Sequence, residues 1–364
     1  MRGQEEQKME QLRKREASRE RSRSRRRHRH RAGAAAGLVL KAAPLLGPGL
    51  VRRLDRRRDR GAMEPYAAAP GGTDLWAVSR DGTRLHLLSH GEGGRVVFLV
   101  HGWTCNATIY RYQQERFSKN HRVVTVELRG HGMSQVPESL DYSPDRLAED
   151  LKAAVDLIDP ESFVVAGHSM GGFTALRFHR LFGEEYRGRL KGLVIIDSSG
   201  LPLTDGIILG GLIEKLYPFP LDGLLRFVGR HGGGLDSLKA MLKDTSAAYL
   251  LVRWGAFGKR PAGEEVEQVR EMVMNTPLAT VALAAKACID FDNLDALADV
   301  DVPVLLLVGE RDKLTDLEVN RKTADLLPQA RLVTFPDAGH CTLLESKEEF
   351  NRELEGFFSS VFGE

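Results

Sequence analysis

A serine between two glycines is the residue in this chain best suited to nucleophilic chemistry. It stands in Gly167-His168-Ser169-Met170-Gly171, after the apolar run 163–166 and before a helical apolar pattern at 173–182. A serine on a tight strand-to-helix turn needs small neighbours, because side chains at the two glycine positions would crowd the bend and cover the hydroxyl. The pattern and its context predict that Ser169 is a catalytic nucleophile. The alternative is a glycine-rich turn that holds an ordinary serine.

Two polar positions in the last part of the chain could activate this serine. Asp312 follows an apolar run that ends at Gly309, and His340 follows Gly339 after the last apolar run. A serine hydroxyl is a poor nucleophile at neutral pH, so we expect His340 to take its proton and Asp312 to orient the imidazole and stabilise its cation. Asp197 also ends an apolar run, and it is the alternative acid unless it caps a turn.

Apolar runs alternate with helical patterns over most of the chain. This alternation predicts an α/β fold with a doubly wound, mostly parallel sheet whose functional residues lie at the carboxyl ends of strands. A helix is expected from Pro144, capped by the hydroxyl of Ser143, and others near 173–182, 317–327 and 346–361. The strands are expected at 75–79, 83–89, 96–100, 123–128, 163–166, 193–197, 302–309 and 331–335.

The alternation stops for about a hundred residues after Asp197. This interval is rich in apolar residues at helical spacing, which predicts a helical cap at 201–292 inserted into a core formed by 74–200 and 293–364. The apolar side chains of the cap would suit an acyl chain, although the same spacing is needed merely to pack the cap on the core.

The charge of the chain is concentrated near its beginning. Residues 1–60 carry 20 Lys and Arg against 7 Asp and Glu, a net charge of +13, which leaves −11 for residues 61–364 within the total of +2. We expect 1–62 to be largely disordered, and the acidic remainder gives no reason to expect nucleic-acid binding.

An apolar stretch at residues 32–51 lies between arginines and could associate with a membrane. The alternatives are a weak signal-like segment, an interfacial anchor, or an extension that is absent if translation starts at Met63. Cys105, Cys288 and Cys341 show no spacing typical of zinc sites or disulfide frameworks, so we expect reduced thiols and a cytoplasmic protein, with membrane association through 32–51 as the variant.

At four places the chain resembles the α/β-hydrolase family. These are His101-Gly102-Trp103, the turn around Ser169, the loop from Gly309 to Asp312, and Asp337-Ala338-Gly339-His340. The order serine, acid, histidine is the order of that family. Within the family, the layout is most similar to bacterial serine esterases, lipases and non-haem peroxidase-like enzymes.

The resemblance implies a cofactor-free serine hydrolase that acts on small-molecule esters. It assigns the oxyanion hole to the backbone N–H groups of Trp103 and Met170, with the Trp103 side chain as a lining residue. Relatives that hydrolyse epoxides or carbon–halogen bonds have aspartate at the position of Ser169, so serine favours acyl transfer. Hydrolysis of amides or carbon–carbon bonds, perhydrolysis, and a non-catalytic binding role remain alternatives. His101 and His131 are expected to serve structure.

Overall fold

The computed structural model describes residues 68–202, 221–232, 236, 239, 245–292, 294 and 297–363. The division of the chain falls between Gly47 and Pro48, and every described residue belongs to the second unit, Pro48–Glu364. The predictions for residues 1–62, including the apolar stretch 32–51, therefore lie outside the described residues. The same holds for 203–220 in the predicted cap.

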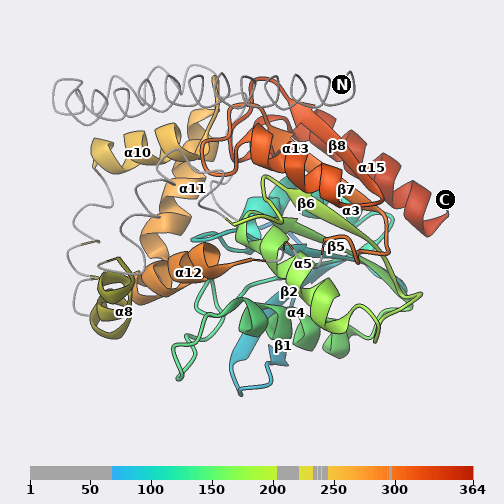
Figure 1. The fold of residues 1–364 in the computed structure, drawn as a ribbon, viewed down its shortest axis with the longest axis horizontal. Helices are drawn as coiled ribbons and strands as arrows, with labels where there is room; N and C mark the ends of the chain where they lie inside the picture. Colours follow the sequence, from blue (N-terminus) through green and yellow to red (C-terminus); the bar gives the residue numbers. More distant parts are fainter. Residues whose placement is uncertain are drawn as a thin grey trace, which may run out of the picture. The chain divides into compact units, whose positions relative to one another are not determined.

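The core of the second unit is an eight-stranded sheet with the order β1-β2-β4-β3-β5-β6-β7-β8 (Figure 1). β1 and β2 pair antiparallel, β2 pairs antiparallel with β4, and every other pair is parallel. This confirms the prediction of a mostly parallel α/β sheet. The strands are β1 (Thr73–Val78), β2 (Arg84–His90), β3 (Arg95–Val100), β4 (Arg122–Val126), β5 (Ser162–His168), β6 (Leu190–Ile196), β7 (Val304–Gly309) and β8 (Ala330–Phe335).

Helices cover both faces of the sheet, which is why its central strands are apolar throughout. Successive residues of a strand point to opposite faces, so Phe98 joins one apolar cluster with α4 and α5 while Leu99 joins the other with α3 and α15. The helices of this core are η1 (Ala107–Tyr110), α3 (Arg111–Phe117), α4 (Pro144–Ile158), α5 (Met170–Phe182), α13 (Leu317–Leu326), α14 (Thr342–Glu345) and α15 (Lys347–Phe362).

Four described helices lie between β6 and β7 in the sequence. They are α8 (Leu221–His231), α10 (Ser246–Ala256), α11 (Gly263–Asn275) and α12 (Leu278–Asp290), and Figure 1 shows them in yellow and orange beside the sheet. Among the described residues, no single helix has the length and apolar character needed to cross a membrane. The pair α11 and α12, bent by 103°, meets that criterion only when the two are taken together.

The start of α4 differs from the prediction in one detail. The helix begins at Pro144 as expected, but the side chain of Ser143 makes no capping hydrogen bond in the described structure. Its backbone N–H instead donates to Oδ1 of Asp141 at 2.9 Å. The predicted cap was therefore wrong, and the described hydrogen bond before the helix is this Asx turn through Asp141.

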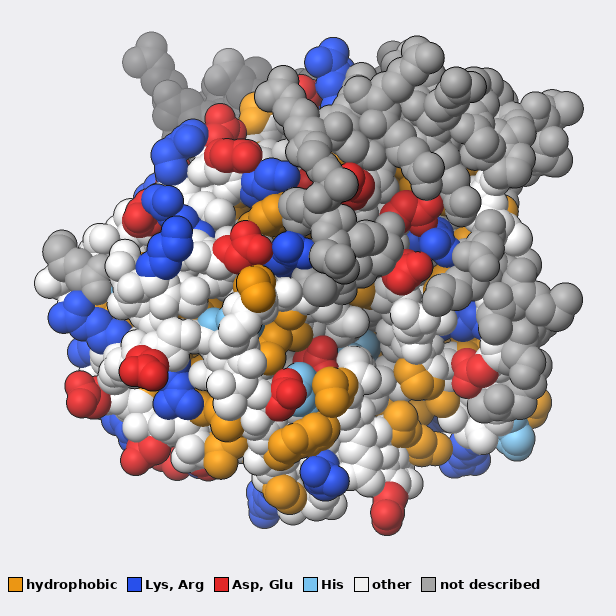
Figure 2. Space-filling view, turned by 180° about the vertical axis from the view of Figure 1, so that it is seen from behind, with side chains coloured by type: hydrophobic (Ala, Val, Ile, Leu, Met, Phe, Trp, Pro, Cys, Tyr) orange, Lys and Arg blue, Asp and Glu red, His pale blue; other side chains and the backbone are white. Residues whose placement is uncertain are grey.

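The surface of the described part carries charges of both signs. In Figure 2, Lys and Arg side chains alternate with Asp and Glu side chains over the visible face, with apolar side chains between them. Among the described residues, Arg116 pairs with Glu355 at 2.8 Å and Arg331 pairs with Glu353 at 2.7 Å. Exposed pairs of this kind contribute little to stability.

Candidate active site

Ser169 lies on the turn between β5 and α5. Its backbone has φ 52° and ψ −117°, a left-handed conformation that a residue with a Cβ adopts at a cost. The turn is held by hydrogen bonds from Ser169 N to Ile196 O at 2.8 Å and from Ser198 Oγ to Ser169 O at 2.7 Å. A strained serine between a strand and a helix is the geometry that presents a nucleophile at the edge of a parallel sheet.

The glycines around Ser169 are required by close backbone contacts. A Cβ at Gly167 would lie 2.1 Å from Gly171 O, and a Cβ at Gly171 would lie 2.0 Å from Val100 O. The need for small residues is therefore as the sequence indicated. The sequence predicted crowding of the bend and covering of the serine hydroxyl, and the contacts are with the backbone of the turn and of β3.

His340 and Asp312 form a buried pair. The Nδ1 atom of His340 lies 2.8 Å from Oδ2 of Asp312. Because an ionised carboxylate can only accept, Nδ1 donates and Nε2 is left as the acceptor of the neutral ring. Asp312 is fixed by three further donors: Leu314 N at 2.7 Å, Thr315 N at 3.1 Å and Thr315 Oγ1 at 2.8 Å.

The electrostatics of this pair favour a charged imidazole. Burial lowers the pKa of His340, but the negative charge of Asp312 and its hydrogen bond outweigh that effect, so the pKa is raised above 6.5. Burial raises the pKa of Asp312, and the attraction of His340 with the hydrogen bonds of the loop brings it below 3.8. The pair can therefore stabilise the imidazolium that forms when His340 accepts a proton.

Asp197, the alternative acid, has other partners. Its Oδ1 accepts from Gly309 N at 3.0 Å, and its Oδ2 accepts from Thr342 N at 2.9 Å and Thr342 Oγ1 at 2.7 Å. Burial and the charge of Asp312 raise the pKa of Asp197 to about 7. The geometry thus brings Asp312 to His340, while Asp197 ties the start of the Asp312 loop to the residues that follow His340.

The two predicted oxyanion residues are Met170, at the start of α5, and Trp103, on the loop after β3. Met170 is the first residue of α5, where backbone N–H groups have no partner within the helix. Trp103 lies on the loop after β3, which passes against the serine, since a Cβ at Gly102 would be 3.0 Å from Ser169 Cβ. The side chain of Trp103 is 38% exposed, and its Nε1 donates to Val281 O on α12 at 2.9 Å. It is therefore more than an apolar lining residue.

His101 and His131 support the loop after β3. His101 donates through Nδ1 to Gly102 O at 2.8 Å and accepts from Leu128 N at Nε2 at 3.1 Å. His131 accepts from Thr104 N at 3.3 Å. Burial lowers the pKa of both residues, that of His131 to about 3, so both rings are neutral and act as hydrogen-bonding supports.

Sequence reasoning missed two residues that hold the histidine loop. The Nε2 atom of His168 donates to His340 O at 2.7 Å, and burial lowers the pKa of His168 to about 3. Glu345 accepts from Gly339 N at 2.7 Å and from Gly258 N at 2.8 Å. An acidic residue one helical turn after His340 is the signal that could have indicated Glu345, whereas its partner Gly258 comes from a distant segment.

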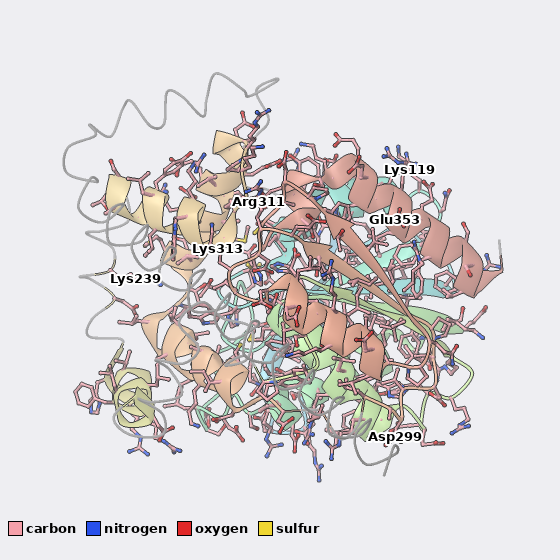
Figure 3. All side chains as sticks on the ribbon, turned by 45° about the horizontal axis from the view of Figure 1, so that its top comes forward. Lys119, Lys239, Asp299, Arg311, Lys313 and Glu353 are labelled. Atoms are coloured by element: carbon pink, nitrogen blue, oxygen red, sulfur yellow. The ribbon has the colours of Figure 1, made fainter. Side chains whose placement is uncertain are left out.

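The acid loop also contacts the helices between β6 and β7. Lys313, labelled in Figure 3, donates to the backbone oxygens of Trp254 and Phe257, the latter at 3.3 Å. His340 N donates to Ala256 O at 2.9 Å. The end of α10 is therefore fastened to both the Asp312 loop and the His340 loop.

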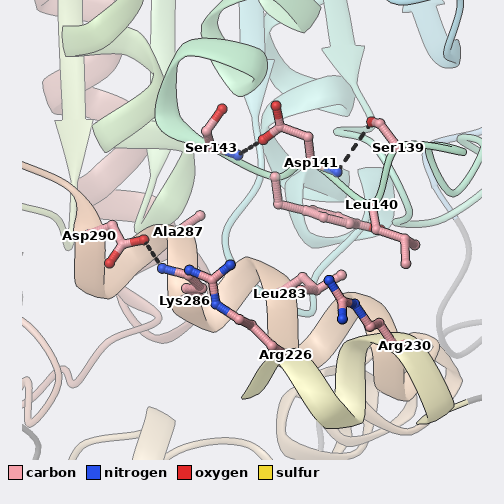
Figure 4. Close-up of a pocket in the computed structure, with 11 residues that line it drawn as sticks. Ser139, Leu140, Asp141, Ser143, Arg226, Arg230, Leu283, Lys286, Ala287 and Asp290 are labelled. Atoms are coloured by element: carbon pink, nitrogen blue, oxygen red, sulfur yellow. Dashed lines mark hydrogen bonds and ion pairs between the residues drawn. The ribbon is translucent and has the colours of Figure 1, made fainter. Parts of the chain in front are cut away.

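A separate cavity of about 320 Å³ lies between α8, α12 and the loop 139–143 (Figure 4). Two basic side chains of its lining form ion pairs, Arg226 with Asp222 at 2.8 Å and Lys286 with Asp290. Ser169, Asp312 and His340 are outside its lining, which comprises Ser139, Leu140, Asp141, Tyr142, Ser143, Arg226, Arg230, Leu283, Lys286, Ala287 and Asp290.

A sheet of this order, with a strained serine after β5 and a buried acid–histidine pair on the loops after β7 and β8, has the layout of an α/β hydrolase. The model of the alpha/beta hydrolase family matches residues 96–353, and the chain belongs to this family.

Known proteins of this family are similar over most of the chain. An AB hydrolase superfamily protein, YisY of Bacillus subtilis, is 26% identical over 73% of this chain and 92% of its own length. A bifunctional esterase/perhydrolase of Acinetobacter calcoaceticus is 28% identical over 78% of this chain and 99% of its own. The malate-bound structure of a thermophilic esterase from Thermogutta terrifontis is 25% identical, with a TM-score of 0.63, and covers 79% of this chain and 99% of its own.

Proposed function

We propose that the protein is a serine hydrolase that cleaves carboxylic esters through an acyl-enzyme. The observation that carries the proposal is the buried His340–Asp312 pair, whose Nδ1 and Oδ2 atoms are 2.8 Å apart, together with a serine held at positive φ on a strand-to-helix turn. Each of these features costs free energy, because burial opposes charge and the serine backbone is strained. A site that keeps both is the arrangement expected for an activated nucleophile.

In the proposed reaction, Nε2 of His340 accepts the proton of Ser169 as its Oγ attacks the carbonyl carbon of the ester. The backbone N–H groups of Trp103 and Met170 stabilise the oxyanion, each by roughly 3 kcal/mol. The bond to the alcohol oxygen then breaks, and His340 returns the proton to the departing alcohol. A water molecule, deprotonated by His340, attacks the acyl group, and the acid leaves as Ser169 regains its proton.

The comparisons support the ester as the substrate class. The relative in Acinetobacter calcoaceticus is named an esterase and perhydrolase, and the structure from Thermogutta terrifontis is named an esterase. The first name also favours a second candidate activity, perhydrolysis, in which hydrogen peroxide in place of water attacks the acyl group on Ser169. Hydrolysis of amides or carbon–carbon bonds would use the same residues.

The test is the turnover of p-nitrophenyl esters of increasing acyl length by the protein and its Ser169→Ala variant. We expect Ser169→Ala to abolish turnover and labelling by a fluorophosphonate, while Ser118→Ala, a serine at the end of α3, keeps both. Full activity of Ser169→Ala would refute the assignment. A folded wild-type protein that resists labelling would favour a binding protein, and a peroxide assay on the same esters separates perhydrolysis from hydrolysis.

We also propose that the apolar stretch 32–51, between arginines, associates the enzyme with anionic membranes that contain its substrate. The test is deletion of residues 1–62 followed by fractionation of membranes. Loss of the protein from the membrane fraction would support the proposal, and an unchanged distribution of the protein between the membrane and soluble fractions would refute it.

A further inference from the structure

The loop after β3 is strained beside the proposed oxyanion donor. Thr104 has φ 61°, in the left-handed region that β-branched residues rarely enter. Such a backbone persists only where its surroundings hold it. Within the core, Thr104 N donates to His131 Nε2 at 3.3 Å and Cys105 N donates to Gly102 O at 3.1 Å.

Two further hydrogen bonds reach this loop from the helices between β6 and β7. The indole Nε1 of Trp103 donates to Val281 O on α12 at 2.9 Å. Thr276 Oγ1, between α11 and α12, shares its single proton between Thr104 O at 3.2 Å and Met272 O at 2.9 Å. They contact the residue with the proposed oxyanion N–H and the strained residue that follows it. The contacts from α11 and α12 therefore reach the Trp103 side chain and the Thr104 carbonyl, one on each side of the peptide between these two residues.

We propose that α11 and α12 hold the oxyanion loop in its strained conformation, and that the Trp103 indole is a positioning residue for its own backbone N–H. The inference rests on the proposed function. The side chain is 38% exposed, and its hydrogen bond to Val281 O on α12 gives the ring a directional contact in addition to packing. Displacement of α12 would turn the Trp103 peptide and withdraw one donor from the oxyanion.

Other contacts dock the same helices without touching the loop. The hydroxyl of Tyr142 lies 2.9 Å from Thr280 Oγ1 on α12, and Gln268 Nε2 on α11 donates to Thr108 O at 2.8 Å. Loss of one of these bonds weakens the attachment of the helices but leaves both bonds to the loop. Tyr142→Phe is therefore a matched control, since it removes one hydrogen bond to the residue next to Val281.

The test compares Trp103→Phe and Thr276→Val with Tyr142→Phe. We expect the first two to lower kcat for a p-nitrophenyl ester about 10-fold, with KM changed less than about twofold. They should also lower the affinity for a trifluoromethyl ketone inhibitor, whose adduct mimics the oxyanion, by a similar factor. Tyr142→Phe keeps wild-type kcat and inhibitor affinity. Equal losses in all three variants, or no loss in Trp103→Phe, would overturn the inference.

A double variant tests whether backbone strain at Thr104 is the reason that the loop needs the Trp103 hydrogen bond. Asparagine tolerates the left-handed region better than threonine, so in a Thr104→Asn background the loop needs less support. We expect Trp103→Phe to cost less than about threefold in kcat there, a coupling that a purely local packing effect would not produce. An undiminished loss would count against the strain argument.

Hydrogen exchange gives a readout that does not depend on catalysis. The backbone amides of 101–108 are expected to exchange faster in Trp103→Phe and Thr276→Val than in wild type, and at the wild-type rate in Tyr142→Phe. If Ser169 supports no turnover, the proposed function fails. The exchange rates still show whether α11 and α12 hold the loop after β3. Unchanged exchange in all variants would refute it.

Discussion

The Nδ1 atom of His340 donates to Oδ2 of Asp312 at 2.8 Å, although a second buried carboxylate, that of Asp197, contributes to the electrostatics of the same imidazole. Asp197 is bonded to the backbone at Gly309 and Thr342 instead. Two carboxylates therefore have two tasks. Asp312 accepts the hydrogen bond of the His340 ring, and Asp197 links the loop after β7 to the residues that follow His340.

Substitution of each carboxylate should separate these tasks. Asp312→Asn should lower kcat on the order of 10³- to 10⁴-fold at neutral pH, because the ring loses the partner that selects its tautomer and stabilises its cation. Asp197→Asn places an N–H group against a donor and should cost about 1–3 kcal/mol of unfolding free energy with a smaller fall in kcat. Ester kinetics and denaturant unfolding of both variants check this; a larger kcat loss in Asp197→Asn would reverse the assignment.

The pH dependence of ester turnover should follow the protonation of His340. The base must be neutral to accept a proton, and the pKa of His340 is raised above 6.5, chiefly by Asp312 against the opposing effect of burial. Turnover should therefore rise with pH, with a midpoint above 6.5. The measurement is kcat/KM from pH 5 to 9, and a flat profile between pH 5 and 8 would contradict His340 as the base.

Glu345 should act on the site through the histidine loop. Glu345→Gln replaces one acceptor by an N–H group that faces Gly339 N or Gly258 N, so we expect a loss of about 1–3 kcal/mol of unfolding free energy and a fall in kcat with little change in KM. The same substitution at the exposed Glu349 on α15 is the control and should leave both quantities unchanged. Melting temperatures and ester kinetics decide; identical behaviour of the two variants would show that Glu345 does not position His340.

The turn glycines should tolerate no side chain. Gly171→Ala would place a Cβ 2.0 Å from Val100 O, so we expect it to cost at least about 1–3 kcal/mol and to abolish fluorophosphonate labelling of Ser169. Gly356→Ala on α15 meets nothing within 4 Å and should stabilise the protein by roughly 0.5–1 kcal/mol. Thermal unfolding of the pair, with labelling, is the measurement; a stable, reactive Gly171→Ala would contradict the geometry of the turn.

Much of the architecture could be predicted because its signals are local. A central strand such as β5 is apolar on both faces, and the pattern changes at Ser169 from strand to helix within a few residues. The prediction of a cap by Ser143 was wrong, because a hydroxyl before a helix can bond to several neighbouring groups and its position in the sequence does not select one.

The sequence by itself determined the sheet, the turn that carries Ser169, and the small set of acids and histidine that could serve it, because these depend on apolar periodicity and on glycines close to one another in the chain. The tertiary structure decided which acid meets His340, that Glu345 holds its loop, and that the Trp103 indole reaches Val281. Each of these joins segments far apart in the chain. Their pairing depends on how the loops and the helices after β6 pack together, which no local pattern records.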